Sequence, residues 1–583
     1  MKRALILVVL LSVAAQAQVN PDSIKSYVKF LSSDELQGRL TGSPQAAAAA
    51  KWIAGKFKAY GVEPLFPGYF QFYDFNAKAV LGSRNSVAAS VDGKTFSAAI
   101  DSDYVPYTYS DSGSANGPVV FAGYGISAKD SNYDDYGNLD VKGKIVVVMK
   151  GSPREDSTSD RLYKFSAVRM KLMTARNLGA SAIIVVNRES DKTLAKFEYD
   201  FSPSAGILAV NMSYAAATRL LEVGGFDLAA SLSKIEKTMS PDSREIKNLE
   251  LNLAIDISIL KTKAINVAGI VRPSGSSDST CYILGAHYDH LGWGPFGSMK
   301  PDTIAIHHGA DDNASGVAGV LELARYYASH REALKKPIVF VCFSGEEEGL
   351  FGSEYFAGHL PMPKNNVGAM LNMDMIGRLR NNRLILGGIG TATQWESFAK
   401  LNDEKLGADS LSLSLDMEGF GPSDHASFYT KSIPVLFFFT DVHSDYHKPS
   451  DTYDKLNYPG EVKVLNFVKA DLDSLESATW RPAFTAVAAQ QRPTEGARAY
   501  LGTIPDFGSQ DVGYKLSGVT PGSPADKAGL RGGDVITKIG SKEIKNIYDL
   551  MYVLQEIKSG DKIVIKYLRN GNKETAEATV SRR

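Results

Sequence analysis

The chain has 583 residues, 44% of them apolar and 22% charged, which is the composition of a globular protein with three or four domains. Its 64 basic and 65 acidic residues give a net charge of -1, which argues against a nucleic-acid binder because phosphate contacts need a basic surplus. Two cysteines exclude a disulfide-stapled scaffold or a cysteine-rich metal module, and no internal apolar run is long enough to span a bilayer.

The amino terminus has the pattern of a secretory signal peptide. Lys2 and Arg3 precede an apolar run over residues 4–14, which is followed by the small residues of Ala15-Gln16-Ala17. This run is too short to span a membrane. We predict that residues 1–17 are removed on export, and that the mature protein works in the periplasm or outside the cell.

The first part of the main domain is expected to span residues 18–116. Residues 45–60 show the apolar spacing of an amphipathic helix, and Gly61 is placed to end it. From residue 82 to residue 116, short strand-like runs alternate with polar turns. The Asp-, Ser- and Tyr-rich stretch at residues 101–116 indicates a domain boundary.

Residues 117–240 are predicted to form an inserted domain. The apolar runs 145–149 and 182–186 indicate buried strands, and residues 165–178 indicate a helix between them. This segment resembles the protease-associated domain that is inserted in several exported peptidases. It holds no cluster of His, Cys or acidic residues, so we expect a role as a lid, a spacer or a determinant of substrate selection.

The end of the chain is predicted to form a small domain, residues 500–583, after a polar linker at 484–499. Residues 518–540 closely resemble a PDZ domain. The resemblance implies a groove that binds an extended peptide or protein terminus, flanked by a helix at 546–557. The loop whose backbone N–H groups would hold a terminal carboxylate is Tyr500, Leu501, Gly502 and Thr503.

Polar side chains follow four apolar, strand-like runs in the second part of the main domain, residues 241–483. Buried parallel strands have this pattern, with polar groups at their carboxyl ends. A fifth segment, residues 309–316, opens a helix and contributes Asp312. We therefore expect five segments to meet at one edge of a sheet. The runs are 281–286, followed by His287 and Asp289; 338–343, followed by Glu346 and Glu347; 369–373, followed by Asp374; and 433–439, followed by Tyr446 and His447.

The chemistry of these side chains indicates a catalytic metal site. Each group alone has an ordinary explanation, since consecutive glutamates often begin a solvated helix. Asp374 is harder to explain, because an unpaired carboxylate in an apolar strand costs several kcal/mol and would become protonated or need a cation. Histidine and carboxylate ligands without thiolates suit zinc in an open site. Cys281 and Cys342 lie within apolar runs and are expected to be buried free thiols.

Two other hydrolase classes are excluded because the sequence lacks their motifs. The zinc-protease motif H-E-x-x-H and the nucleophile elbow G-x-S-x-G are absent. Ser423, Asp424 and His425 are consecutive, so they cannot point at one another as a catalytic triad requires.

Five motifs in a fixed order carry a specific resemblance. They are His287-Tyr-Asp289, Gly309-Ala-Asp-Asp-Asn-Ala-Ser-Gly316, Gly345-Glu-Glu-Glu-Gly-Leu-Phe-Gly-Ser353, Asn372-Met-Asp374 and Asp445-Tyr-His447. They resemble the motifs of the dizinc aminopeptidases, a family that includes glutamate carboxypeptidase II, glutaminyl cyclase and the catalytically silent transferrin receptor. The segments 33–39 and 41–44 are similar to the family's opening segment. The resemblance covers residues 20–110 and 250–480, and it implies an α/β fold with a mixed sheet flanked by helices.

The resemblance implies two zinc ions that share Asp312 as a bridging ligand. His287 and Asp374 would complete one zinc site, and Glu347 and His447 would complete the other. Two zinc ions roughly 3.5–4 Å apart need a shared carboxylate to offset their repulsion.

The resemblance also implies roles for four neighbours of the ligands. Glu346 matches the general base, which takes a proton from the water held by the two zinc ions and gives it to the leaving amine. Asp289 matches the carboxylate that orients the His287 ring. Tyr446 matches a tyrosine that hydrogen-bonds the oxyanion in some members. The bond between Asp312 and Asn313 matches a cis peptide.

The function implied is hydrolysis of N-terminal peptide bonds by an exported metallo-exopeptidase. A glutaminyl-cyclase-like acyltransferase is an alternative, but its single zinc would not need His287 and Asp374. A carboxypeptidase is another alternative, although no basic cluster for a substrate carboxylate is identified. The two accessory domains would also suit a non-catalytic peptide-binding protein, which would be marked by lost ligands, and none is lost.

Overall fold

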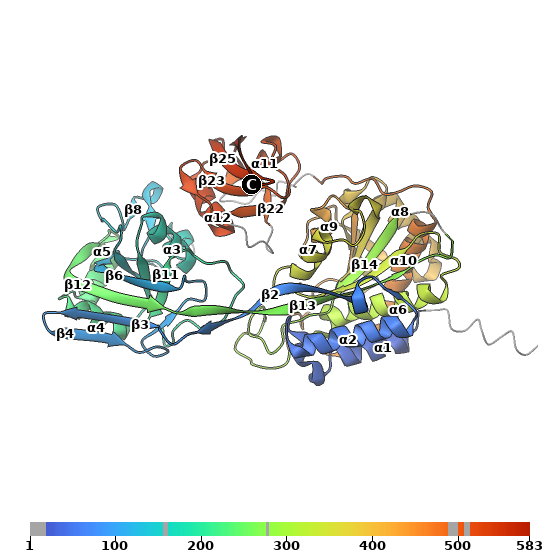
Figure 1. Ribbon diagram of the computed structural model, residues 1–583, viewed down its shortest axis with the longest axis horizontal. Coiled ribbons are helices and arrows are strands. Elements are labelled where there is room, and N and C mark those ends of the chain that lie inside the picture. Colours follow the sequence, from blue (N-terminus) through green and yellow to red (C-terminus); the bar gives the residue numbers. More distant parts are fainter. Residues whose placement is uncertain (1–18, 155–160, 276–278, 488–498, 506–512, 583) are drawn as a thin grey trace, which may run out of the picture. The chain divides into compact units, whose positions relative to one another are not determined.

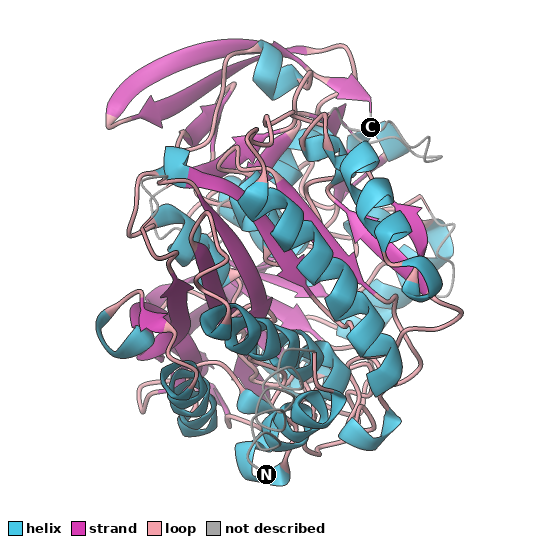
Figure 2. Cartoon of the chain, turned by 90° about the vertical axis from the view of Figure 1, so that its right-hand side faces the viewer, coloured by secondary structure: helices cyan, strands magenta, loops and turns pink. Residues whose placement is uncertain are grey.

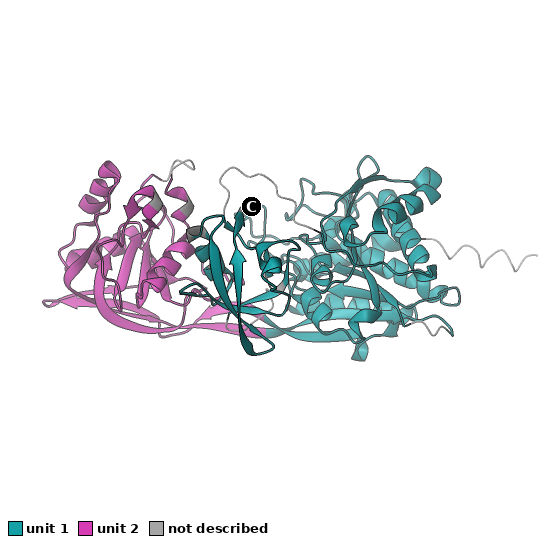
Figure 3. Cartoon of the chain, turned by 90° about the horizontal axis from the view of Figure 1, so that it is seen from above, with its two compact units in different colours: residues 1–75, 262–583 teal, residues 76–261 magenta. Residues whose placement is uncertain are grey.

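The computed structural model describes residues 19–154, 161–275, 279–487, 499–505 and 513–582. The predicted signal peptide and residues 488–498 of the predicted linker lie outside these ranges. The chain forms two compact units, residues 1–75 with 262–583 and residues 76–261 (Figure 3). Within the described residues, no helix is long and apolar enough to cross a membrane.

The first unit is built on a nine-stranded mixed sheet. Its four central strands are parallel and buried, apart from Phe439 at the end of the last one, which explains why they are continuous apolar runs in the sequence. Strands β13 and β17 pair antiparallel on either side of this block. In sheet order, the strands are β1 (Glu63–Pro64), β13 (Ile257–Val271), β15 (Ile338–Phe343), β14 (Cys281–His287), β16 (Val367–Met373), β19 (Val435–Phe439), β17 (Arg383–Gly387) and β18 (Ser412–Leu415), with β2 (Phe70–Leu81) also paired to β13.

Helices cover both faces of this sheet (Figures 1 and 2). Alternating residues of β14 enter two separate cores: Tyr282 and Leu284 pack with one set of helices, and Ile283 packs with the other. Cys342 and Cys281 belong to different cores, and both are buried free thiols. The first core is formed with α1 (Pro21–Leu31), α2 (Pro44–Ala59), α6 (Gly316–Ser329), α8 (Trp395–Lys405) and α10 (Tyr458–Ser477), and the second with α7 (Phe351–Gly358) and α9 (His425–Tyr429).

The second unit, residues 76–261, contains the predicted strand–helix–strand segment within a larger eight-stranded sheet. Strands from before residue 117 and after residue 240 complete this sheet, because β12 pairs antiparallel with both β3 and β6. The strands in order are β4 (Lys94–Ala98), β3 (Ser86–Val91), β12 (Arg244–Ile255), β6 (Gly113–Phe121), β9 (Ile145–Met149), β10 (Ala182–Val186), β11 (Leu208–Met212) and β5 (Tyr104–Pro106), and the helices are α3 (Val168–Asn177), α4 (Tyr214–Val223) and α5 (Leu228–Thr238).

The described carboxy-terminal residues form a six-stranded sheet, a separate two-stranded sheet and two helices. The helix predicted at 546–557 is present as α12 (Ile547–Glu556), and α11 (Pro524–Lys527) is a single turn. The strands are β20 (Ala499–Tyr500) paired with β27 (Ser581–Arg582), and β21 (Thr503–Pro505), β22 (Tyr514–Val519), β23 (Val535–Ile539), β24 (Lys542–Glu543), β25 (Lys562–Arg569) and β26 (Asn572–Thr579).

Candidate metal centre

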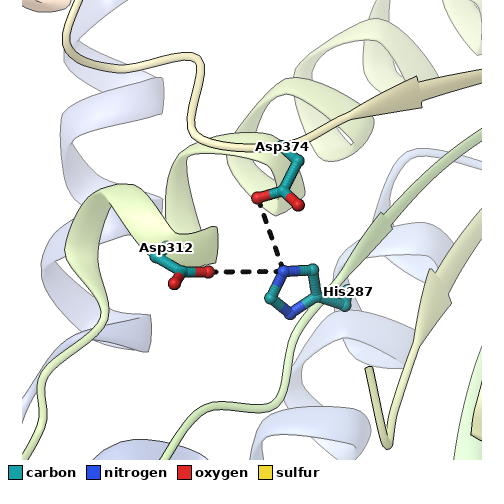
Figure 4. A group of neighbouring side chains, drawn as sticks. All are labelled: His287, Asp312 and Asp374. Atoms are coloured by element: carbon teal, nitrogen blue, oxygen red, sulfur yellow. Dashed lines mark ion pairs between the residues drawn. The ribbon is translucent and has the colours of Figure 1, made fainter. Parts of the chain in front are cut away.

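The five segments singled out in the sequence meet at the carboxyl edge of the parallel strands. His287 is the last residue of β14, and Asp374 directly follows β16. Glu346 and Glu347 lie in the turn after β15, while Asp312 lies in the turn that opens α6. Figure 4 shows His287, Asp312 and Asp374 pointing toward one another from these three elements. The expected convergence is therefore present in the fold.

Asp312 stands between two sets of side chains. Its Oδ1 lies 3.4 Å from His287 Nε2, which is also 3.5 Å from Asp374 Oδ1. Its Oδ2 lies 3.1 Å from His447 Nε2, and the same nitrogen lies 3.1 Å from Glu347 Oε2. The two oxygens of one carboxylate thus face two separate groups of donors.

These separations suit zinc. Two atoms bound at about 2.0 Å to one tetrahedral zinc lie about 3.3 Å apart, and the observed separations of 3.1–3.5 Å bracket that value. His287 Nε2 and Asp374 Oδ1 are buried, and among the residues that the structure describes neither atom has a hydrogen-bond partner. Buried polar atoms without a partner are rare, and a metal ion would supply one here. The donor set therefore fits two zinc ions.

The pKa values of the carboxyl groups in the site are shifted because several charged groups are buried close together. Burial alone would raise the pKa of Asp312, but the neighbouring imidazole rings of His287 and His447 hold it well below its ordinary value. Burial and the Asp312 charge oppose ionisation of Glu347, yet His290 and His447 lower its pKa to about 2. Burial raises the pKa of Glu346 well above its ordinary value, and the charge of Glu347 adds to that rise. Without a metal ion, Asp312 and Glu347 are thus favoured as carboxylates and Glu346 as the protonated acid, and all three would be ionised together only beside added cations.

Contacts around Asp289 differ in detail from the expected orientation of His287. His287 Nδ1 lies 3.3 Å from the Asp289 backbone oxygen and 3.8 Å from its carboxylate Oδ1, so the backbone oxygen is the closer acceptor. The other carboxylate oxygen, Oδ2, accepts hydrogen bonds from Thr41 Oγ1 at 3.0 Å and from Glu347 N at 3.3 Å. Asp289 therefore links two further segments of the chain to the site.

Tyr446 and Glu346 each contact one of the candidate histidine ligands. Tyr446 stacks on the His447 ring with 3.8 Å between centroids, and burial together with the nearby carboxylates raises its pKa. Glu346 Oε2 lies 3.9 Å from His287 Nε2. The peptide bond between Asp312 and Asn313 is cis.

Sequence reasoning missed His290. This histidine is completely buried, and its Nδ1 lies 2.6 Å from Glu347 Oε1 and 3.9 Å from Asp312 Oδ2. A ligand atom of His290 lies within 4.8 Å of the corresponding atoms of Asp312 and Glu347. The signal available was its position three residues after His287, but that spacing predicts neither burial nor direction in a loop.

Supports for the ligand-bearing turns were also missed. Asp451 Oδ2 accepts hydrogen bonds from the backbone N–H groups of Asp311 (2.8 Å) and Asp312 (3.2 Å). Arg378 pairs with Asp445 at 2.9 Å and with Asp451 at 3.5 Å. Arg378 therefore ties the turn before His447 to the turn of Asp312.

Ser423 has a place in the site that does not depend on a triad. Its hydroxyl donates to Asp374 Oδ2 at 2.8 Å and accepts from Asn372 Nδ2 at 2.8 Å. The serine therefore fixes the carboxylate of Asp374, leaving Oδ1 turned toward His287.

The predicted carboxylate-binding loop of the carboxy-terminal domain runs from β20 into β21. Leu501 is buried, and its backbone oxygen accepts a hydrogen bond from Ala525 N at 2.8 Å. Gly502 has a φ of 80°, and its oxygen accepts from Thr520 N at 2.7 Å. Tyr500 pairs with Ser581, and Thr503 pairs with Val519.

Comparison with known proteins decides the family. The model of peptidase family M28 matches residues 266–470, the PA domain model matches 115–220, and the PDZ domain model matches 505–580. The chain is 30% identical over 228 residues to the uncharacterized protein YfbL of Escherichia coli, a match that covers 34% of this chain and 68% of that protein. The chain belongs to peptidase family M28. The predictions of a metallopeptidase, a protease-associated domain and a PDZ domain are confirmed at this level.

A further relative and two solved structures are similar to different shares of the chain. Aminopeptidase YwaD of Bacillus subtilis is 30% identical over 205 residues, which cover 33% of this chain but only 40% of that protein. Among solved structures, an aminopeptidase from Aneurinibacillus sp. strain AM-1 is 21% identical, with a TM-score of 0.49 and coverage of 82% of this chain and 98% of that one. A zinc aminopeptidase from Bacillus subtilis is 21% identical, with a TM-score of 0.48 and coverage of 78% and 95%.

Proposed function

We propose that this M28 member is an exported dizinc aminopeptidase that hydrolyses N-terminal peptide bonds. The observation that carries the proposal is the position of Asp312, whose two oxygens face two sets of donors. His287 and Asp374 would hold one zinc ion, and Glu347 and His447 the other. When bound, two zinc ions would polarise the scissile carbonyl and lower the pKa of an attacking water.

Glu346 is proposed as the general base. It adjoins Glu347 in sequence, and its carboxylate faces the same space as His287, at 3.9 Å. A carboxylate in this place takes a proton from the attacking water and passes it to the departing amine nitrogen. Tyr446, half-buried beside His447, would donate its hydroxyl proton to the oxyanion that forms on the substrate carbonyl.

Export and peptide recognition complete the proposal. Residues 1–17 would direct the chain out of the cytoplasm. The loop of residues 500–503 would bind the terminus of an extended peptide or protein, in keeping with the PDZ domain match.

The test is the variant Glu346→Gln, which keeps the size of the side chain and removes the base. We expect two zinc ions per chain, as in the unaltered protein, and a fall in kcat of about 100- to 10,000-fold on aminoacyl substrates. Zinc content is measured by atomic emission and turnover by release of the amine. Glu396→Gln, an exposed change in α8, is the matched control and should retain full activity. Undiminished turnover in Glu346→Gln would falsify the assignment of the base.

A further inference from the structure

A completely buried arginine lies beside the metal centre and has no part in the proposed chemistry. Arg39 ends the short helix Asp34–Arg39. It lies in the segment 33–39, which resembles the opening segment of the dizinc aminopeptidases and has no role assigned to it so far. Its φ of 50° is in the left-handed region, which a non-glycine residue adopts only at a cost in free energy. Gly38, with a φ of 72°, allows close approach, since a Cβ there would lie 2.5 Å from His307 O.

The Arg39 guanidinium donates hydrogen bonds to backbone oxygens of two segments, the one that carries His287 and the one that carries Asp312. Nε donates to Tyr288 O at 2.7 Å, and Tyr288 lies between His287 and Asp289. Nη2 donates to Gly309 O at 3.0 Å, and Nη1 to His308 O at 2.9 Å, just before the turn that carries Asp312. One planar group with a fixed fork of donors thus spans the gap between the two segments.

Thr41 extends these contacts to a third segment. Its hydroxyl donates to Asp289 Oδ2 at 3.0 Å and accepts from Gly345 N at 3.0 Å. Gly345 directly precedes Glu346 and Glu347. Residues 39–41 therefore contact the turns after β14 and β15 and the turn before α6.

Stability alone explains this arrangement poorly. In the part of the chain that the structure describes, Arg39 forms no ion pair, and its acceptors are neutral carbonyl groups, including Leu31 O. Removing a guanidinium from water costs several kcal/mol, which hydrogen bonds to carbonyls offset in part. Its positive charge acts on the neighbouring carboxylates Asp289, Asp312 and Glu347. The arrangement of its N–H donors fits the backbone oxygens of the segments that carry His287 and Asp312, whereas an apolar side chain would fill a protein core at a lower cost.

We infer that Arg39 is a positioning residue of the metal centre, which sets the separation of His287 and Asp312 by holding the backbone of both their segments. The inference rests on the proposed zinc site. Arg39 contacts neither substrate nor zinc, and acts only through the residues it holds. Neighbours that orient metal ligands typically change metal affinity by about 10- to 100-fold when altered.

The test compares zinc affinities, measured by competition with a chromophoric chelator. Arg39→Lys keeps the positive charge but cannot reach Tyr288 O and Gly309 O together, and we expect zinc binding to weaken about 10- to 100-fold. Arg39→Met, which removes the charge as well, should weaken it at least as much. The control is Lys336→Met: Lys336 is also buried and donates to backbone oxygens, including Glu476 O at 3.0 Å, but precedes β15 at the strand end opposite to Glu346.

Three results separate the possibilities. Zinc affinity of Arg39→Lys equal to that of the unaltered protein would overturn the positioning role. Equal weakening in Lys336→Met would also overturn it, because the effect would then follow from losing any buried cation. Absence of zinc binding in the unaltered protein would instead reject the proposed metal centre. If Arg39→Met does not fold, the zinc affinity of Arg39→Lys alone still tests the positioning role.

Discussion

His447 is held at both ring nitrogens. Nδ1 lies 2.7 Å from the carbonyl oxygen of Gly297, which fixes a proton on that nitrogen. This contact turns Nε2 toward Asp312 and Glu347, each 3.1 Å away. The Tyr446 ring, stacked on the imidazole, limits its rotation. The neighbouring tyrosine is therefore in a position to serve the reaction as well as the ligand.

Tyr446→Phe tests whether the hydroxyl acts on the substrate. The ring, and with it the stacking on His447, is preserved, so zinc content should not change. Loss of one oxyanion donor should lower kcat by about 100- to 1,000-fold and leave KM nearly constant. Steady-state kinetics on an aminoacyl substrate supply both constants. A change confined to KM would show that the hydroxyl only binds the ground state.

The candidate ligands could be singled out at this scale because each one follows an apolar strand or opens an apolar helix, and such patterns are local. His290, Arg39 and Thr41 could not, because their contacts join residues far apart in the chain. The Arg39 bond to Gly309, for example, spans 270 positions. Nothing in the residues around Arg39 indicates a buried guanidinium, since arginine is usually exposed.

Elements hold the ligand turns in place by close packing. Helix α7 begins directly after the turn of Glu346 and Glu347 and returns over the end of β15. At Gly352, in its first turn, an added Cβ would lie 2.5 Å from Asn266 Oδ1 and would overlap the backbone oxygen of Ser344. The backbone of α7 therefore approaches the strand end more closely than a side chain would permit.

Gly352→Ala should force this helix away from β15. We expect a loss of about 1–3 kcal/mol in the free energy of unfolding, with weaker zinc binding because the Glu347 turn moves with the helix. Gly358→Ala in the same helix meets no atom within 4 Å and is the matched control, expected to be neutral or slightly stabilising. Urea unfolding followed by circular dichroism measures both variants. Equal stability of the two would contradict the packing argument.

The existence of most elements follows from local pattern, whereas their grouping into sheets does not. Strands β9 and β10 agree with the apolar runs that predicted them, and helix α12 agrees with the helix that the resemblance to a PDZ domain implied. The sheet of residues 76–261 reaches beyond the predicted insert of 117–240 because β12 pairs with β3, more than 150 positions earlier. Such pairings depend on tertiary contacts that no local window contains.

At the scale of the whole molecule, the metal centre belongs to one unit. The two groups of neighbouring histidine and acidic side chains found among the described residues are both in the unit of residues 1–75 and 262–583. The unit of residues 76–261 has a core of its own. Bound zinc should therefore stabilise the first unit and not the second.

Chelation tests this difference by calorimetry. Free zinc at 1,000 times its Kd stabilises the state that binds it by about 4 kcal/mol, so removing zinc should lower the Tm of one transition by several degrees. The transition of residues 76–261 should stay where it is. Re-addition of zinc should restore the first transition together with peptidase activity. Equal shifts in both transitions, or in neither, would argue against a metal confined to one unit.

The contacts of Arg39 and Thr41 have a consequence for biosynthesis. A ribosome delivers these residues early, but the side chains and carbonyl groups they meet emerge hundreds of residues later, and His447 emerges later still. The intervening unit can fold first, since its core draws on its own residues. A partly translated chain thus lacks the complete set of candidate zinc ligands until His447 has left the ribosome.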